Sequence, residues 1–164
     1  MKRFFITFLI GGLLGGIGGF VLAIFVYPYI FLADVTAMEH LPERADRKLV
    51  ASGDFIHANP SDPIHYGRGG VQVYDDAVQL GADFEVGPGP KFHVYLVPLA
   101  EVTPDTAVEN ALYVDLGRLR AFKGSQVFQI PAGVALQDFP NVVIWCAQFN
   151  VLISPAKLTF QEGA

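Results

Sequence analysis

The stretch Val78-Gln79-Leu80-Gly81-Ala82-Asp83-Phe84-Glu85-Val86 decides the fold class. Apolar residues stand at every second position, with polar residues or glycine between them. Successive side chains of a β-strand point to opposite faces, so this period of two is typical of a strand with one buried face. Gly87-Pro88-Gly89-Pro90 interrupts the pattern and Lys91 to Val97 resumes it. The two runs therefore predict a hairpin.

The chain from residue 49 onward shows the same character. Further strands are expected at 51–57, 70–74, 113–116, 126–130, 142–153 and 156–160. Gly, Pro, Asn and Asp residues separate these runs, and no internal repeat or long amphipathic helix is visible among them. We expect an all-β fold, a β-sandwich of about seven to eight short antiparallel strands, preceded by one N-terminal transmembrane helix.

The N-terminal segment is apolar. No charged residue occurs from Phe4 to Leu32, and as a helix this run would be about 44 Å long, more than the ~30 Å hydrocarbon core of a bilayer. It exceeds the apolar region of a cleavable signal peptide, although Val35-Thr36-Ala37 keeps cleavage open as an alternative. Pro28 is expected to end or kink the helix. Three aromatic residues would form a belt at the outer interface: Tyr27, Tyr29 and Phe31.

Lys2 and Arg3 precede the apolar run and predict a cytoplasmic N-terminus, with the C-terminal domain periplasmic or extracellular at the cell membrane. Arg44, Arg47 and Lys48 on the far side weaken this bias. The expected organisation is an anchor at 1–33, a polar tether at 34–48 and an all-β domain at 49–164.

Glycines recur along the apolar run. Pairs spaced four residues apart involve Gly11, Gly12, Gly15, Gly16 and Gly19. Such pairs allow close approach of two helices, so we expect docking against an integral-membrane partner or a second copy. The alternative is that glycine is simply common in membrane helices.

Composition narrows the function classes. The net charge of the 164 residues is −5 and no cluster of Lys and Arg stands out, so nucleic acid is not an expected partner. Cys146 is the single cysteine, which excludes an internal disulfide. The usual hydrolase, metalloprotease, phosphate-loop and dinucleotide motifs are absent from the sequence. An independent enzyme is not predicted, and a redox role stays open.

Cys146 lies in the strongest predicted strand, 141–153. The alternation places Trp145, Ala147, Phe149 and Val151 on a core face. Cys146 is on the opposite face, which changes there from apolar to polar, so the thiol is expected near a boundary. A redox thiol needs a nearby cation or similar influence that favours the thiolate, and three residues are candidates: Arg118, Arg120 and Lys123. The alternative is a half-buried cysteine that acts as a small hydrophobic residue.

Other polar residues suggest weaker sites. His57, Asp62 and His65 flank the turn Asn59-Pro60-Ser61-Asp62-Pro63. They could bind a metal together, but their spacing matches no established zinc pattern, and a solvated turn is the favoured interpretation. His93 is interpreted as a strand residue, and Asp75-Asp76 as a turn between two strands. No metal site is predicted.

Several stretches together resemble the DM-thirteen domain of the electron-transfer DM-thirteen family. One is Tyr113-Val114-Asp115-Leu116-Gly117-Arg118-Leu119, followed by Lys123-Gly124-Ser125-Gln126 and Phe128-Gln129-Ile130-Pro131; another is Val142-Val143-Ile144-Trp145-Cys146. Earlier pieces are 53–57, 67–73 and His93-Val94-Tyr95-Leu96, so the resemblance covers about residues 51–158.

The resemblance implies an all-β domain in which Cys146 acts in redox chemistry, either as a bare thiol or as a ligand of a prosthetic group such as haem. It also implies that a redox partner protein supplies the electron partner. We therefore expect a membrane-tethered, extracytoplasmic electron-transfer or thiol-redox module centred on Cys146. The alternative is a non-catalytic accessory or binding subunit of a membrane complex, docked through the glycine-rich helix.

Overall fold

The computed structural model describes residues 2–31, 35–43 and 46–161. One long helix, α1 (Lys2–Phe31), precedes the strands of the described chain. These are β1 (Thr36–Met38), β2 (Leu49–Phe55), β3 (Gly67–Tyr74), β4 (Ala77–Leu80), β5 (Glu85–Val86), β6 (Phe92–Val97), β7 (Val114–Arg118), β8 (Lys123–Gln129), β9 (Asn141–Cys146), β10 (Val151–Lys157) and β11 (Thr159–Phe160). Two 3₁₀ turns, η1 (Val108–Asn110) and η2 (Leu136–Asp138), lie between strands. The prediction of an all-β fold behind one apolar helix is confirmed.

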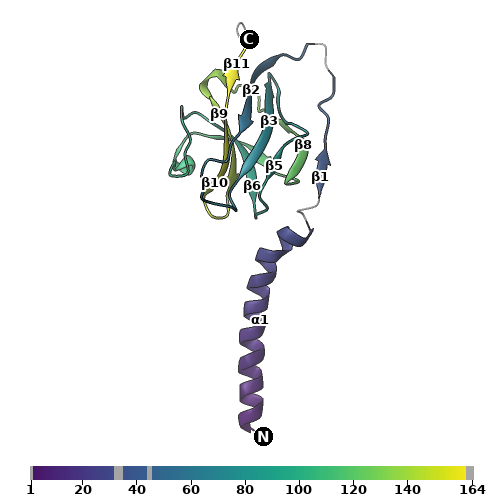
Figure 1. Cartoon of the computed structure of the whole chain (residues 1–164), viewed down its shortest axis with the longest axis vertical. Helices are drawn as coiled ribbons and strands as arrows, with labels where there is room; N and C mark the ends of the chain where they lie inside the picture. Colours follow the sequence, from purple (N-terminus) through teal and green to yellow (C-terminus); the bar gives the residue numbers. More distant parts are fainter. Residues whose placement is uncertain (1, 32–34, 44–45, 162–164) are drawn as a thin grey trace.

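Helix α1 extends away from the strands (Figure 1), and its described side chains are exposed. Within it, Lys2–Ile24 is long and apolar enough to cross a bilayer, with a mean hydropathy of 2.1. Pro28 does not end the helix, which continues to Phe31, and Figure 1 shows α1 bending before it ends. The side chains of Tyr29 and Phe31 in the predicted aromatic belt lie outside the described part of the chain, as does Arg44.

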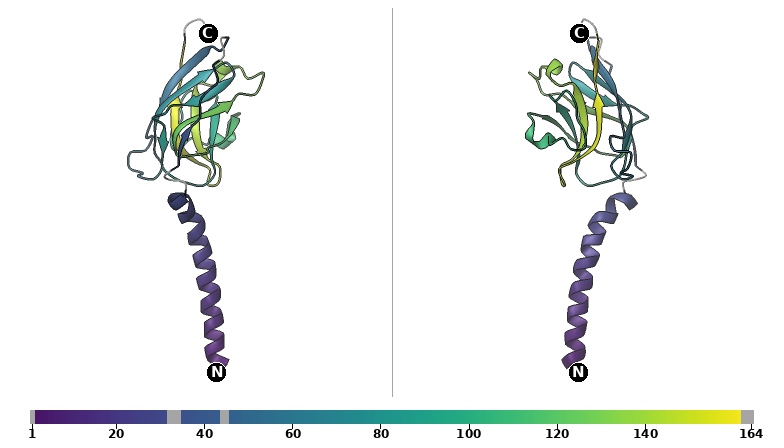
Figure 2. Two further views of the ribbon diagram at one scale, coloured as in Figure 1. Left: turned by 90° about the vertical axis from the view of Figure 1, so that its right-hand side faces the viewer. Right: turned by 60° about the vertical axis from the view of Figure 1, so that its left-hand side comes forward.

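The strands form two layers of one folded sheet (Figures 1 and 2). The order is β1-β8-β4-β3-β2-β10-β9-β6-β7, with β11 beside β2 and β5 bridging β3 and β8. The pairs are antiparallel except β1 with β8, which are parallel. Strands β2, β3, β7 and β8 begin and end within three residues of the predicted runs.

The predicted hairpin around Gly87–Pro90 is wrong. The run 78–86 is two short strands, because Gly81 and Phe84 close a turn: Phe84 N donates to Gly81 O at 3.1 Å. Both strands, β4 and β5, pair with β3 and β8, whereas β6 pairs with β7 and β9. The segment 87–91 therefore crosses from one layer to the other.

The expected tether contains a strand of the domain. Thr36, Ala37 and Met38 pair with Lys123, Gly124 and Ser125 of β8. Gly124 permits this approach, since its φ is +87° and a Cβ there would lie 2.1 Å from the carbonyl oxygen of Ala37. The start of the tether is thus part of the sheet. The outer limits of the domain at 49 and 164 remain a prediction.

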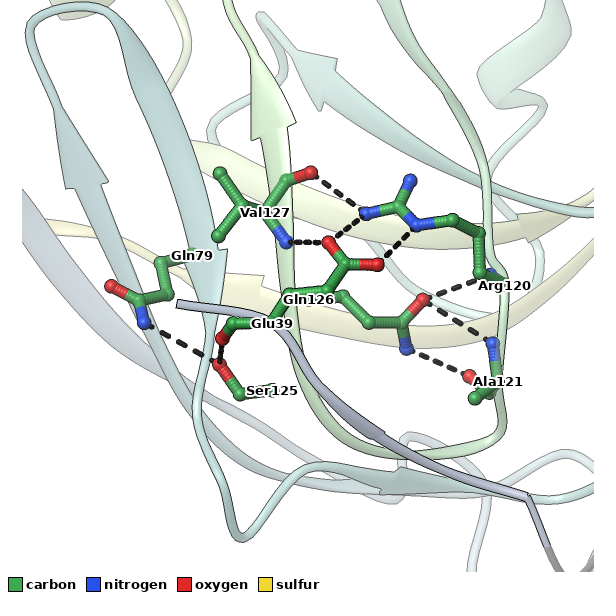
Figure 3. Close-up of polar contacts among 7 residues, drawn as sticks. All are labelled: Glu39, Gln79, Arg120, Ala121, Ser125, Gln126 and Val127. Atoms are coloured by element: carbon green, nitrogen blue, oxygen red, sulfur yellow. Dashed lines mark hydrogen bonds and ion pairs between the residues drawn. The ribbon is translucent and has the colours of Figure 1, made fainter. Parts of the chain in front are cut away.

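A network of polar contacts holds the chain just after β1 (Figure 3). The Glu39 carboxylate accepts hydrogen bonds from Nε and Nη2 of Arg120, both at 2.5 Å, and from the Val127 amide at 2.9 Å. Ser125 Oγ donates to the Glu39 carbonyl at 2.7 Å. The Arg120 guanidinium also lies 4.5 Å from the ring centroid of Phe128. We call these Glu39–Arg120 contacts the β1 clamp.

The core has two parts that lie on opposite faces of the layer containing β9. The larger part fills the space between the layers and includes Val71, Leu80, Phe128 and Ile144. The smaller part, which includes Tyr95, Val108 and Trp145, lies under the 98–113 connection. Every residue of β9 is buried, because both of its faces are covered.

Candidate functional site around Cys146

Strand β9 ends at Cys146, and this position determines the environment of the thiol. Val142, Ile144 and Cys146 belong to the larger core, whereas Val143 and Trp145 belong to the smaller one. Cys146 is only 2% exposed. The expected face is correct, but the thiol is buried rather than lying at a polar boundary.

The predicted strand 142–153 is really a β-hairpin. Residues 147–150 form a turn between β9 and β10, and Asn150 has a φ of +53°, a conformation that asparagine tolerates better than most residues. Phe149, predicted to be in the core, is 50% exposed in this turn. Asn150 could have indicated this turn from the sequence, but the alternating pattern around it favoured one continuous strand.

The segment 87–91 contacts the sulfur through Pro90. Cys146 Sγ donates to the Pro90 carbonyl oxygen at 3.3 Å, and the Ala147 amide donates to the Lys91 carbonyl oxygen at 3.1 Å. The segment also lies close to the Phe92 ring, since a Cβ on Gly89 would be 2.4 Å from that ring. We call residues 87–91 the thiol cover.

The Pro90 carbonyl oxygen is the hydrogen-bond partner of the sulfur among the described residues. Two of the expected cations are engaged elsewhere: Arg120 pairs with Glu39, and Lys123 Nζ lies 3.5 Å from Glu85. Arg118 is exposed at the end of β7. Arg120 and Lys123 thus have partners other than the sulfur.

The surroundings of Cys146 do not fit a haem. A prosthetic group of that size needs a cavity of several hundred Å³. The cavity beside the cover, lined by Gly89, Phe92 and Phe122 among others, has a volume of about 20 Å³ and does not include Cys146. Filling the space around the sulfur would displace the packed core to which it belongs. Cys146 is therefore best considered as a bare thiol.

The histidines of the 56–66 connection stabilise a turn. His65 Nδ1 lies 2.6 Å from Asp62 Oδ2, and the amides of Ile64 and His65 donate to Asp62 Oδ1. These bonds, with that to His65 first, lower the pKa of Asp62 to about 2. His57 Nε2 lies 2.7 Å from the Asp62 backbone oxygen rather than its carboxylate. The Asp62 amide donates to the Asn59 carbonyl oxygen at 2.9 Å, which closes the predicted turn. No cluster of three metal-ligating side chains occurs among the described residues.

A polar and aromatic group on the outer face of β6 was not predicted. His93 lies in β6, as expected, and its Nδ1 is 3.0 Å from both carboxylate oxygens of Asp115 in β7. Tyr95 stacks on Tyr113 with ring centroids 4.3 Å apart. Burial is the main factor that raises the pKa of Tyr95. The period-two pattern places His93 and Tyr95 on one face of the strand. It does not indicate that Asp115 and Tyr113 are their partners.

Asp75, Asp76 and the glycines of α1 lie away from Cys146. Asp75 and Asp76 form the turn between β3 and β4, as predicted, and Asp76 pairs with Arg47 at 2.8 Å. The glycines of α1 have no other atom within 4 Å of a built Cβ. Their faces are therefore open for contact with another helix.

The family model described as "Electron transfer DM13" matches residues 61–158. This chain belongs to the DM13 family. The matched DM13 region runs from the 56–66 connection through β10 and includes Cys146 and its cover. Membership gives the protein a general electron-transfer or redox role. No curated protein and no solved structure was found to match the chain.

Proposed function

We propose that this protein is a membrane-tethered, extracytoplasmic thiol-redox module in which Cys146 is the reacting group. The observation that carries the proposal is the position of the single thiol in the DM13 region. It lies at the end of β9 directly beneath a five-residue cover, and its one hydrogen bond among the described residues goes to that cover. The S–H bond itself is weak, and backbone bonds at Gly87 and Lys91 also hold the cover.

The reaction requires a second protein, because the chain has one cysteine. When the cover opens, the Cys146 thiol loses its proton to solvent. The thiolate then attacks one sulfur of a partner disulfide, and the S–S bond breaks as a mixed disulfide forms. The partner's other sulfur leaves as a thiolate and takes up a proton. Cys146 is oxidised and the leaving sulfur is reduced. A further thiolate of the partner then attacks the partner sulfur of the mixed disulfide, so that a partner disulfide forms, the bond to Cys146 breaks, and Cys146 leaves as a thiolate that takes up a proton.

The chemistry can be tested with a small aromatic disulfide, dithiobis(nitrobenzoate), and the folded, full-length protein. The expected result is slow formation of one mixed disulfide per chain, with release of one coloured thiolate. Cys146→Ser should abolish it and leave the fold intact by circular dichroism. A rate equal to that of global unfolding, measured in parallel by hydrogen exchange, would identify Cys146 as a structural residue only.

The location at a membrane is supported by α1 and by β1. The apolar span Lys2–Ile24 can serve as an anchor or a signal peptide on length and composition alone. Cleavage at Val35-Thr36-Ala37 would divide β1, whose residues pair with β8, and this favours a retained anchor. Protease added outside sealed spheroplasts should digest the domain if it is extracytoplasmic. Protection in intact spheroplasts, with digestion after lysis, would place it in the cytoplasm.

The open glycine faces of α1 favour a second candidate function, an accessory subunit docked through the helix. Gly15→Leu should then remove membrane partners that co-purify with the protein. Ala23→Leu adds the same side chain to the same helix outside the glycine run and should retain them. Equal co-purification with both variants would reject this candidate.

A further inference from the structure

The anchor enters the domain at one defined end. Helix α1 ends at Phe31 and β1 begins at Thr36. The five Cα–Cα steps between these residues can span at most about 18 Å. Because β1 is parallel to β8, with Thr36 opposite Lys123, the chain enters where β8 begins. The far end of β8 is roughly 20 Å farther away at the usual rise per residue of a strand.

Four connections lie at this same end. The connection 119–122 leads directly into β8, and the Leu119 amide donates to the Phe92 carbonyl oxygen where β6 begins. Phe92 pairs with Cys146, so the turn 147–150 is also there. The Gly87 amide donates to the Tyr66 carbonyl oxygen, which adds 56–66 and the thiol cover. We call these four connections, 56–66, 87–91, 119–122 and 147–150, the anchor-side end; Figures 1 and 2 show loops gathered beside the end of α1.

The anchor-side end combines exposed apolar side chains with charges of both signs. Ile56 is 57% exposed, Ile64 53% and Phe149 50%. Four basic residues lie in or next to these connections outside the clamp: Arg68, Lys91, Arg118 and Lys123. Four acidic residues accompany them: Asp54, Asp62, Asp83 and Glu85. Exposed apolar groups without an excess of negative charge are suited to the interface of a bilayer.

The opposite end is more acidic, although Arg47 next to it pairs with Asp76. Its connections 75–76, 98–113 and 130–140 carry six acidic residues: Asp75, Asp76, Glu101, Asp105, Glu109 and Asp138. These three connections contain no Lys or Arg. Contact of this end with anionic lipid would be repulsive.

The β1 clamp fixes which end faces the membrane. Without the contacts of β1, the free chain from Phe31 to Leu49 could span about 65 Å and let the domain turn over. The pairing of β1 with β8 and the bidentate Glu39–Arg120 ion pair shorten this free chain to the segment before Thr36. The clamp therefore acts as an orienting device.

We propose that the anchor-side end rests on the headgroup layer of the bilayer that α1 spans, with Ile64 and Phe149 in contact with lipid. This inference rests on the proposed membrane anchoring. It places the thiol cover at the membrane surface, so a redox partner reaches Cys146 there. The acidic end faces the aqueous phase.

The test uses full-length protein in vesicles of phosphatidylcholine and phosphatidylglycerol, with a Cys146→Ser background and one environment-sensitive fluorophore. The label is attached through Ile64→Cys at the anchor-side end or through Leu112→Cys in the 98–113 connection. Leu112 is the matched control, because it is an 88% exposed leucine at the acidic end. Lipids with a nitroxide on the headgroup should quench the label at position 64 strongly and the label at position 112 weakly. Equal quenching at both positions would overturn the inference.

A second variant tests the clamp. Glu39→Ala should reduce the difference in quenching between positions 64 and 112 while the domain stays folded. An unchanged difference would show that the clamp does not orient the domain. Loss of the protein from floated vesicles would overturn both the inference and the anchoring on which it rests. The thiol chemistry of Cys146 is measured separately, so its failure would leave the quenching result unaffected.

Discussion

The β1 clamp and the thiol cover both close over the sheet, yet they are held by different chemistry. The clamp has three hydrogen bonds to one carboxylate, two of them from a charged guanidinium. The cover is held over the sulfur by one S–H contact at 3.3 Å and by neighbouring backbone bonds. Bonds between charged groups are about twice as strong as neutral ones, and thiols are weak donors.

This difference indicates what each segment does. The clamp joins the segment that follows α1 to the sheet through charged groups. The contact between the cover and the sulfur is weak by comparison, and the backbone bonds at Gly87 and Lys91 supply the rest of its attachment.

The largest effect is expected at Phe92, which lies beneath the cover. Its ring is 5% exposed and packs edge-on against Phe122 with centroids 5.8 Å apart. Phe92→Ala should lower the free energy of unfolding by about 3–5 kcal/mol, because it leaves a cavity in the core. Urea denaturation measures this, and Leu112→Ala, an exposed leucine, should change it by less than about 0.5 kcal/mol. A small effect at Phe92 would mean that its ring does not contribute to the packed core beneath the cover.

The next effect concerns opening of the cover. Gly89→Ala places a methyl group within 2.4 Å of the Phe92 ring and should push the cover away from the sulfur. Alkylation of Cys146 in the purified protein should accelerate about tenfold, which corresponds to ~1.4 kcal/mol. Gly70→Ala is the control, since its nearest neighbour would be an ordinary 3.8 Å away. Equal alkylation rates in the two variants would show that the cover does not control access to Cys146.

Loss of the clamp should have a smaller effect on stability. Both side chains of the Glu39–Arg120 pair are more than a third exposed, Glu39 at 36% and Arg120 at 46%. Glu39→Ala should therefore cost only about 1 kcal/mol in a urea titration. A loss above the effect of Phe92→Ala would show that the clamp is part of the folding core rather than an attachment.

The clamp also predicts a pH dependence. The hydrogen bond from Arg120, then that from Val127, lowers the pKa of Glu39 from its usual value of 4.5. The contribution of Glu39 is complete above that value and is lost as the pH falls through the lowered pKa of the folded state. Urea titrations between pH 6 and pH 3 should show this loss in the wild type and less of it in Glu39→Ala. Parallel curves for the two proteins would contradict it.

The smallest effect is expected in the 56–66 connection. The pKa of Asp62 is about 2 in the folded protein, against an ordinary value of 3.8. Its stabilising contribution should be present above pH 3.8 and disappear as the pH falls toward 2. Asp62→Asn should remove this part of the acid dependence, as followed by tryptophan fluorescence. An identical acid transition in the variant would show that the turn does not depend on the charge.

Several features were predictable because they depend on local patterns. Period-two alternation identified β2, β3, β7 and β8, and the charge-free run identified α1. The family resemblance singled out Cys146. The pattern failed where a turn interrupts it without Pro, as at Gly81 and Asn150, because alternation on both sides continues in register.

The rest depends on contacts between distant segments. Strand β1 has three residues, too few for a periodic signal, and its position is set by Gly124 and Arg120, more than eighty residues away in sequence. The cover over Cys146 comes from residues fifty-six positions earlier. The pairing of β6 with β9 rather than β5 follows from closing the second layer, which no local rule encodes.

Intact-mass analysis of the protein from native membranes tests the redox role of Cys146. The sample is acid-quenched after brief exposure to a small alkylating agent, with Cys146→Ser as control. We expect slow modification of Cys146, or a pre-existing disulfide adduct released by reduction, in folded protein. Absence of both, with modification only after denaturation, would contradict it and identify Cys146 as a residue of the core alone.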